Sequence, residues 1–172
     1  MVRMTHFIAI EITDLNVRRE LQELHAKMAK YRPEWAATFV NPSFSHLTLL
    51  ALEIGNEQIL ANATKKFWEI ATAHRQEFIE RPIEFSMSML DIMHTRRGKV
   101  IYIKADPPKE DAERLTKYIF KIGEELEKVS VKVERRRDAI FFHMSVANTE
   151  IAKPQNVEIK DEEIRKFGKA DG

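Results

Sequence analysis

Two short stretches of the chain each carry a histidine followed two residues later by a hydroxyl side chain. His46 and Thr48 lie in the stretch FSHLTLLAL, and His143 and Ser145 lie in FFHMSVAN. Both stretches are otherwise apolar and are typical of strands, in which side chains at i and i+2 point to the same face. Each stretch therefore predicts an imidazole and a hydroxyl that project together from an apolar strand.

Two imidazoles and two hydroxyls suit the cleavage of a phosphodiester bond. An imidazole titrates near pH ~6.5, so at neutral pH one can serve as a base and the other as an acid. Each such proton transfer contributes roughly 10²–10⁴ to the rate. The hydroxyls can donate hydrogen bonds to the non-bridging phosphoryl oxygens, where charge develops in the transition state. This chemistry needs no metal and no cofactor, and we expect neither.

Two other interpretations of the histidines remain open at this point. A single His-x-Thr pattern is common by chance, and a histidine that only supports the fold is the alternative for either motif. The two motifs match in three respects, however: each follows an aromatic residue (Phe44 or Phe142), each lies in an apolar strand, and each falls in one of two similar halves. A zinc site is the second alternative, but neither motif has an acidic residue at i+2 or i+4 to complete a ligand set.

The pattern of apolar residues predicts the elements that hold these motifs. We expect strands over residues 7–11, 46–52, 83–89, 99–105, 129–133 and 139–147. Apolar residues at spacings near 3.6 predict helices over 17–28, 59–70 and 115–126, with Asp14, Asn56 and Asp106 as N-caps and Pro107 at a first helical position. Two similar α/β halves with short links favour antiparallel or mixed sheets. If the halves pack about an approximate two-fold axis, the two motifs meet in one cleft.

Composition narrows the class of protein. The chain has 172 residues, enough for one domain or two small lobes that share a core. A formal net charge of +1 argues against a general polyanion binder, so any contact with nucleic acid should be local. There is no cysteine, which excludes disulfides and fits a reducing, cytoplasmic compartment. No apolar stretch approaches the ~20 residues that a membrane span needs, and we expect no membrane partner.

Several residues outside the two motifs are candidates for substrate binding. Tyr102 can stack on a base, which contributes roughly 1–3 kcal/mol; core packing is its alternative role. Arg96 lies in an expected loop and can meet a phosphate, although a solvated turn explains it as well. Phe7 is the analogous aromatic on the first strand, with core packing preferred. Residues 135–137 are a run of arginines that can contact an RNA backbone.

Two further histidines and the C-terminal segment complete the expectations. His25 and His74 fall on expected helices, where we expect surface or edge positions. From Thr149 onward the chain is charged and weakly patterned. We therefore expect one domain over residues 1–150, followed by a charged and partly mobile tail over 151–172 that contains a short helical turn.

The paired motifs resemble the signature of the two-histidine (2H) phosphoesterase superfamily, which is two His-x-Thr/Ser-x motifs with a hydrophobic last position. The matching residues are His46-Leu47-Thr48-Leu49 and His143-Met144-Ser145-Val146. The opening FIAIEI and the later VIYIKADP resemble strands of that superfamily, and the resemblance covers roughly Phe7 to Asn148. The second motif has serine where threonine is commoner, and a late strand found in many LigT-like members is hard to place.

The resemblance implies an α+β, bilobal fold in which two antiparallel-sheet lobes with outer helices surround a central groove. It implies a metal-independent phosphodiesterase, a phosphoric diester hydrolase, with His46, Thr48, His143 and Ser145 as catalytic residues. The implied substrates are 2′–5′ oligoadenylates or related 2′-linked or 2′,3′-cyclic phosphodiesters of RNA or nucleotides. The sequence leaves the oligomeric state open, with a monomer favoured. LigT-type proteins, the central domain of A-kinase anchoring proteins and viral 2′–5′ phosphodiesterases are the subfamilies concerned. The alternative is a nucleotide- or RNA-binding or anchoring module with this fold and little catalysis.

Overall fold

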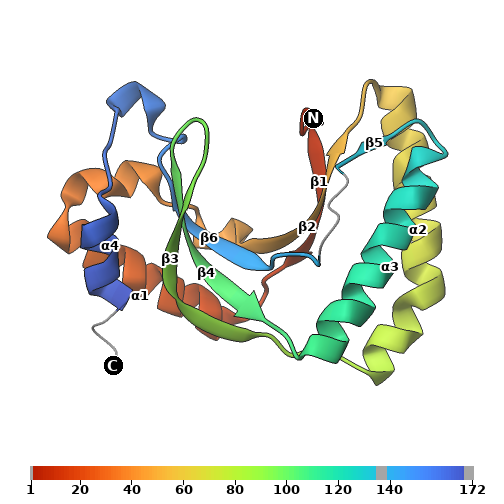
Figure 1. Cartoon of the computed structure of the whole chain (residues 1–172), viewed down its shortest axis with the longest axis horizontal. Coiled ribbons are helices and arrows are strands. Elements are labelled where there is room, and N and C mark those ends of the chain that lie inside the picture. Colours follow the sequence, from red (N-terminus) through yellow and green to blue (C-terminus); the bar gives the residue numbers. More distant parts are fainter. Residues whose placement is uncertain (1, 135–138, 169–172) are drawn as a thin grey trace. The chain divides into compact units, whose positions relative to one another are not determined.

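The computed structural model describes residues 2–134 and 139–168, which fold into two compact units (Figure 1). Unit 1 comprises Met1–Ala9, Thr48–Ser86 and Asp106–Phe141, and unit 2 comprises Ile10–Leu47, Met87–Ala105 and Phe142–Gly172. Each unit is thus assembled from three separate segments. Neither unit coincides with the N-terminal or the C-terminal half of the chain.

Unit 1 combines three strand segments with two long helices. The strands are the first part of β1 (His6–Glu11), most of β2 (His46–Glu53) and β5 (Lys132–Val133), and the helices are α2 (Glu57–Glu80) and α3 (Lys109–Glu127). Strand β5 pairs antiparallel with β2, with Leu52 opposite Val133. The two helices lie side by side (Figure 1). The expected stripe of α3 is buried, at Leu115, Ile119, Ile122 and Leu126.

Both ends of α3 differ from the boundaries expected from the sequence. The helix begins at Lys109 and not at Pro107, because a proline disfavours helical dihedral angles in the residue before it and Pro108 acts on Pro107 in this way. After the helix, Ser130 adopts a left-handed conformation with φ of 71°, and the amide of Val131 donates to the carbonyl of Leu126. The strand is expected to begin at residue 129, but residues 129–131 belong to this turn. Strand β5 is therefore short.

Unit 2 is an antiparallel sheet with α1 on one face. Its strands are the start of β2, then β6 (His143–Asn148), β4 (Lys99–Asp106) and β3 (Ser86–His94), in that order across the sheet. Helix α1 (Leu15–Tyr31) begins after Asp14, whose carboxylate accepts from the amides of Asn16 and Val17 as expected of an N-cap. The fold class predicted from the sequence, α+β with antiparallel strands and outer helices, is confirmed.

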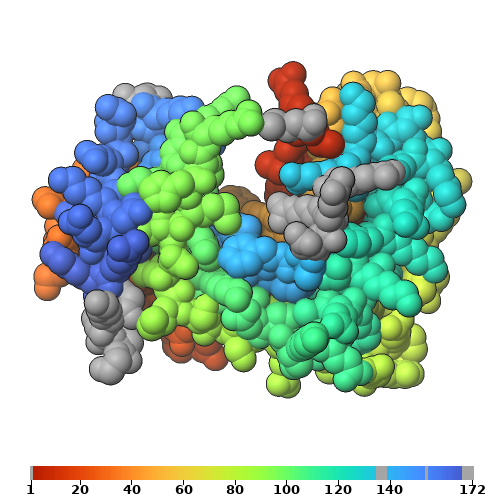
Figure 2. Space-filling model, viewed as in Figure 1, coloured from red at the N-terminus to blue at the C-terminus, as the bar shows by residue number. Residues whose placement is uncertain are grey.

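Strand β3 extends further than its pattern predicts. The strand begins at Ser86 and not at residue 83, it continues through residues 90–94, and the turn is confined to Thr95–Gly98. Thr95 closes this turn twice: its amide donates to the carbonyl of Gly98, and its hydroxyl accepts from the Gly98 amide. Most residues of β3 are exposed. The green atoms of Figure 2 show the region of the β3–β4 hairpin at the surface.

The C-terminal segment contains helix α4 (Asp161–Gly168) in unit 2. Ile159 and Ile164 are each 1% exposed, and Arg32 of the α1 C-cap forms a 2.7 Å ion pair with Glu163. Acidic residues in the first turn and basic residues in the last complement the helix dipole. The domain boundary at residue 150 and the mobility of the tail stay predictions, and residues 169–172 lie outside the described chain. Within the described ranges, no helix is long and apolar enough to cross a bilayer.

Candidate active site

Three neighbouring strands of unit 2 place His46, Ser145 and Tyr102 in one row. Strands β2 and β6 pair antiparallel with Leu47 opposite Met144, so the adjoining pair is His46 and Ser145. Ser145 is in turn the partner of Tyr102 on β4. Directly opposite residues of antiparallel strands project from the same face. The row therefore presents an imidazole, a hydroxyl and a phenol together.

His143 lies on the same face, two residues before Ser145 on β6. Its ring meets the ring of Tyr102 edge-on, with centroids 5.5 Å apart. His46 and His143 are thus diagonal neighbours on adjacent strands, positions that lie roughly 7–8 Å apart. Both rings are half-buried, and a single phosphate group can contact the two of them.

A backbone carbonyl fixes the orientation of His46. Its Nδ1 lies 2.8 Å from the carbonyl oxygen of Phe44, so in the neutral ring Nδ1–H donates and Nε2 holds the lone pair. Phe44 ends the short 3-10 helix Pro42–Phe44, which is capped by the side chain of Asn41. The Asn-Pro sequence at the start of this helix is a recognisable turn signal. The hydrogen bond between Phe44 and His46, however, cannot be read from the sequence.

Tyr102 is 8% exposed, and its hydroxyl lies 3.4 Å from Oδ2 of Asp91 on β3. Burial raises the pKa of the Tyr102 phenol, and the negative charge of Asp91 raises it further. The phenol therefore stays protonated and donates to the carboxylate. Asp91 escapes the sequence prediction because β3 is expected to end at residue 89.

The remaining predicted residues lie elsewhere. Thr48 follows His46 on β2 but belongs to unit 1. Phe7 also belongs to unit 1, where it lines an apolar groove of about 420 Å³ with Trp68 of α2. Arg96 is exposed in the turn between β3 and β4. The site roles of Thr48, Phe7 and Arg96 stay predictions, and the arginines at 135–137 lie outside the described residues.

His25 differs from its expected surface position. It is 8% exposed, its ring stacks on Phe39 with centroids 4.3 Å apart, and its Nε2 lies 2.8 Å from the carbonyl oxygen of Val146. Burial lowers the pKa of the His25 imidazole, and this effect outweighs the hydrogen bond to Val146, which raises the pKa. The signal was available, because Leu21, His25 and Met28 share the buried stripe of α1 at spacings of 4 and 3.

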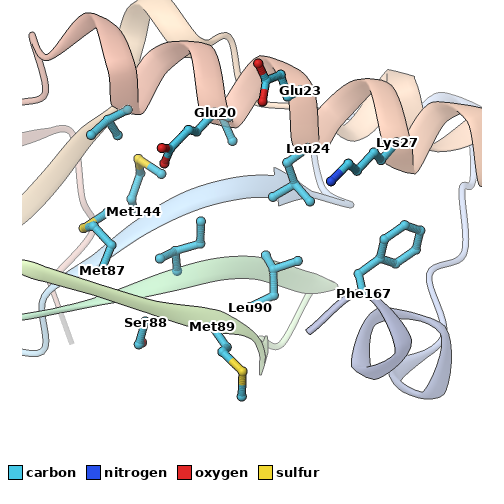
Figure 3. A pocket seen from close by; sticks show the side chains of 13 residues that line it. Glu20, Glu23, Leu24, Lys27, Met87, Ser88, Met89, Leu90, Met144 and Phe167 are labelled. Atoms are coloured by element: carbon cyan, nitrogen blue, oxygen red, sulfur yellow. The ribbon is translucent and has the colours of Figure 1, made fainter. Parts of the chain in front are cut away.

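A groove of about 300 Å³ lies between α1 and β3 in unit 2 (Figure 3). Its apolar lining includes Leu21, Leu24, Met87, Leu90, Met144 and Phe167. Met144 lies between His143 and Ser145 on β6, so its side chain projects from the opposite face of the sheet. The groove is therefore distinct from the face that carries the histidines.

The side chains of the row suit acid–base chemistry. Among residues 2–134 and 139–168, no three histidine, aspartate or glutamate side chains gather in a group that can hold a metal ion. The two imidazoles are able to exchange protons with the attacking and leaving oxygens of a phosphodiester, and Ser145 can donate a hydrogen bond to a phosphoryl oxygen.

The comparisons with known proteins place this chain in the 2H phosphoesterase superfamily. The family model described as "AKAP7 2'5' RNA ligase-like domain" matches residues 4–170, and the chain belongs to this family. The fold is also similar to the crystal structure of TT0787 of Thermus thermophilus, with a TM-score of 0.53 and 25% identity over 83% of this chain and 72% of that chain. No curated protein gives a significant match.

Proposed function

We propose that the chain is a metal-independent phosphodiesterase that cleaves 2′–5′-linked or 2′,3′-cyclic phosphodiesters of RNA or nucleotides. The observation that carries the proposal is the diagonal placement of His46 and His143 on one face of unit 2, beside Ser145 and Tyr102. Membership of a 2′5′ RNA ligase-like family supports the choice of 2′-linked substrates. The proposed ligand is a small nucleotide or oligonucleotide, bound by a monomer.

In the cleavage of a 2′–5′ linkage, one histidine deprotonates the adjacent 3′-hydroxyl. That oxygen attacks the phosphorus and forms a 2′,3′-cyclic phosphate, while the bond to the 5′-oxygen breaks. The other histidine donates a proton to the departing 5′-oxygen. Ser145 hydrogen-bonds a non-bridging oxygen, and Thr48 is proposed for the same role on the strength of its motif alone.

The hydrogen bond from His46 to the carbonyl of Phe44 allows His46 to act either as the base or as the acid. With Nδ1 donating to the carbonyl, His46 exchanges its catalytic proton through Nε2. The neutral ring is then ready as a base, and the protonated ring is ready as an acid. Which histidine takes which role depends on how the substrate is seated between them.

The test is a substrate panel incubated with the full chain in EDTA. The panel contains 2′–5′ triadenylate, 2′,3′-cyclic AMP, 3′–5′ triadenylate and RNA with a 2′,3′-cyclic end. We expect cleavage of the 2′-linked or cyclic members, and a fall of roughly 10²–10⁴ in turnover for each of His46→Ala and His143→Ala. His74→Ala on α2 removes a histidine outside the row and serves as the matched control.

Three outcomes contradict the proposal. Full activity in either variant excludes the acid–base pair. An absolute requirement for added metal excludes the metal-independent mechanism. Binding of the panel without any product favours the alternative, a nucleotide- or RNA-binding module with this fold.

A further inference from the structure

Strand β6 contains one extra residue beside the candidate site. On β4, Ile101 and Tyr102 are consecutive, but their partners on β6 are Ala147 and Ser145. Val146 is thus the additional residue of a β-bulge. Val146 and Ala147 are both fully buried, so the bulge lies in the interior of unit 2.

The bulge determines which side chains of β6 lie on the face of the sheet that carries His46. Without it, the pairing of Ile101 with Ala147 would continue to Tyr102 with Val146 and to Ile103 with Ser145. A shift of one residue moves every side chain of a strand to the other face. Ser145 and His143 would then point toward α1. The bulge therefore allows Ala147 to pack in the core while Ser145 lies beside Tyr102.

The buried ring of His25 holds the bulge from α1. The carbonyl oxygen of Val146 accepts from the backbone amide of Val40 at 3.0 Å and lies 2.8 Å from Nε2 of His25. The ring stacks on Phe39 with an interplanar angle of 6°, and Phe39 itself bridges to Ala147. Val146 is therefore bound on this side by a side chain and a neighbouring backbone segment at once.

We propose that His25 is a positioning residue, which holds the Val146 bulge and thereby sets the orientation of His143 and Ser145. The inference rests on the proposed function for its catalytic consequence, but its structural content does not. His25 touches neither substrate nor reacting atoms. It acts through the carbonyl of Val146, the residue that directly follows Ser145 on β6.

Two substitutions separate the hydrogen bond from the ring. His25→Phe keeps a ring stacked on Phe39 and removes the donor, whereas His25→Gln keeps an N–H donor of similar reach and removes the ring. We expect His25→Phe to lower kcat about tenfold or more with little change in KM, because small misplacements of reacting groups are costly. His25→Gln should restore most of the lost turnover. His25→Leu is a second variant without a donor.

A readout independent of turnover is the NMR titration of the His143 imidazole between pH 5 and 8. We expect a shifted His143 titration in His25→Phe and His25→Leu, and a wild-type titration in His25→Gln. Wild-type His143 titrations in well-folded variants without a donor would overturn the proposal. Loss of the fold in both of these variants would overturn it as well, since His25 would then be structural only. If wild type cleaves no substrate, the proposed function fails while this titration still decides the role of His25.

Discussion

The ring of Tyr102 meets the imidazole of His143 edge to face, with centroids 5.5 Å apart and planes inclined at 70°. The other end of the same side chain reaches Asp91, 3.4 Å from the phenol oxygen. Tyr102 is thus held between an acidic residue of β3 and the candidate acid–base residue of β6. An aromatic edge contact of this kind restricts the orientation of the imidazole and contributes about 0.5–1.5 kcal/mol beyond the buried area.

The first prediction separates the two ends of Tyr102. Tyr102→Phe keeps the edge contact and removes the bond to Asp91, so we expect the His143 titration and kcat to stay close to wild type. Tyr102→Leu removes the aromatic edge, and we expect a shifted His143 titration with a several-fold fall in kcat. Histidine NMR and steady-state kinetics measure both. Identical titrations in wild type and Tyr102→Leu would refute the orienting role.

The second prediction concerns the Ser145 hydroxyl and rests on the proposed function. Ser145→Ala removes a donor aimed at the phosphoryl oxygens, and the loss of one such donor costs roughly 10²–10³ in turnover. Ser145→Thr keeps the hydroxyl and should retain most activity. Ser88→Ala, on the edge strand β3, is the matched control. Equal kcat values for Ser145→Ala and wild type would remove the hydroxyl from the mechanism.

The third prediction uses the ion-pair cluster at the start of α4. Asp161 accepts hydrogen bonds from Lys99 and His94, each at 2.8 Å, and these lower the pKa of its carboxyl from 3.8 to about 2. Because the folded pKa lies below the unfolded one, the stabilisation is present above pH ~4 and is lost as the pH falls through 2. Asp161→Asn should therefore lower stability at pH 5 but much less at pH 2.

Urea unfolding midpoints at several pH values between 5 and 2 measure this difference. Glu158→Gln removes a charge from the same segment and serves as the control. A gap between wild type and Asp161→Asn that is constant from pH 5 to 2 would show that the cluster does not stabilise the fold.

The fourth prediction tests the packing of α3 in unit 1. A Cβ atom at Gly123 would lie 3.2 Å from Cγ1 of Val133 and 3.3 Å from Cδ2 of Leu50. Gly123→Ala should change the free energy of unfolding by less than about 1 kcal/mol, because the gain in helix propensity offsets the tight contact. Gly123→Val should destabilise by roughly 1–3 kcal/mol through overpacking. Urea unfolding measures the free energy of unfolding of each variant. A Gly123→Val variant as stable as wild type would contradict the close packing of Gly123 against Val133 and Leu50.

The helices are predictable because a buried stripe repeats with the period of the helix. The stripe from Leu115 to Leu126 is buried, and the caps at Asp14 and Asn56 bond as expected. The predicted boundaries of α3 and β5 are wrong where single residues impose their own backbone conformation, as Pro108 and Ser130 do. Such effects depend on two or three residues and leave the apolar pattern almost unchanged.

The candidate site is only partly readable from the chain. Strand alternation predicts that each histidine shares a face with a hydroxyl, but it cannot say which strands are neighbours. It also cannot show the Val146 bulge, because an extra residue is defined only against the partner strand. The burial of His25 is readable from the stripe of α1, but its contact with Val146, 121 residues away, is not. Asp91 is missed because β3 continues past its expected end. The catalytic roles of the two motifs stay predictions.

The assembly of unit 2 from separated segments also concerns its synthesis on the ribosome. His46 emerges early, but β6, the neighbour of β2 that carries the second histidine, begins at His143, which is 143 − 46 = 97 residues later. At about 5–20 residues per second, the delay is roughly 5–20 s. During that time β2 lacks its partner β6, and pairings of such long range also form slowly. A nascent chain released before residue 143 carries His46 on β2 but lacks β6, which supplies His143 and Ser145.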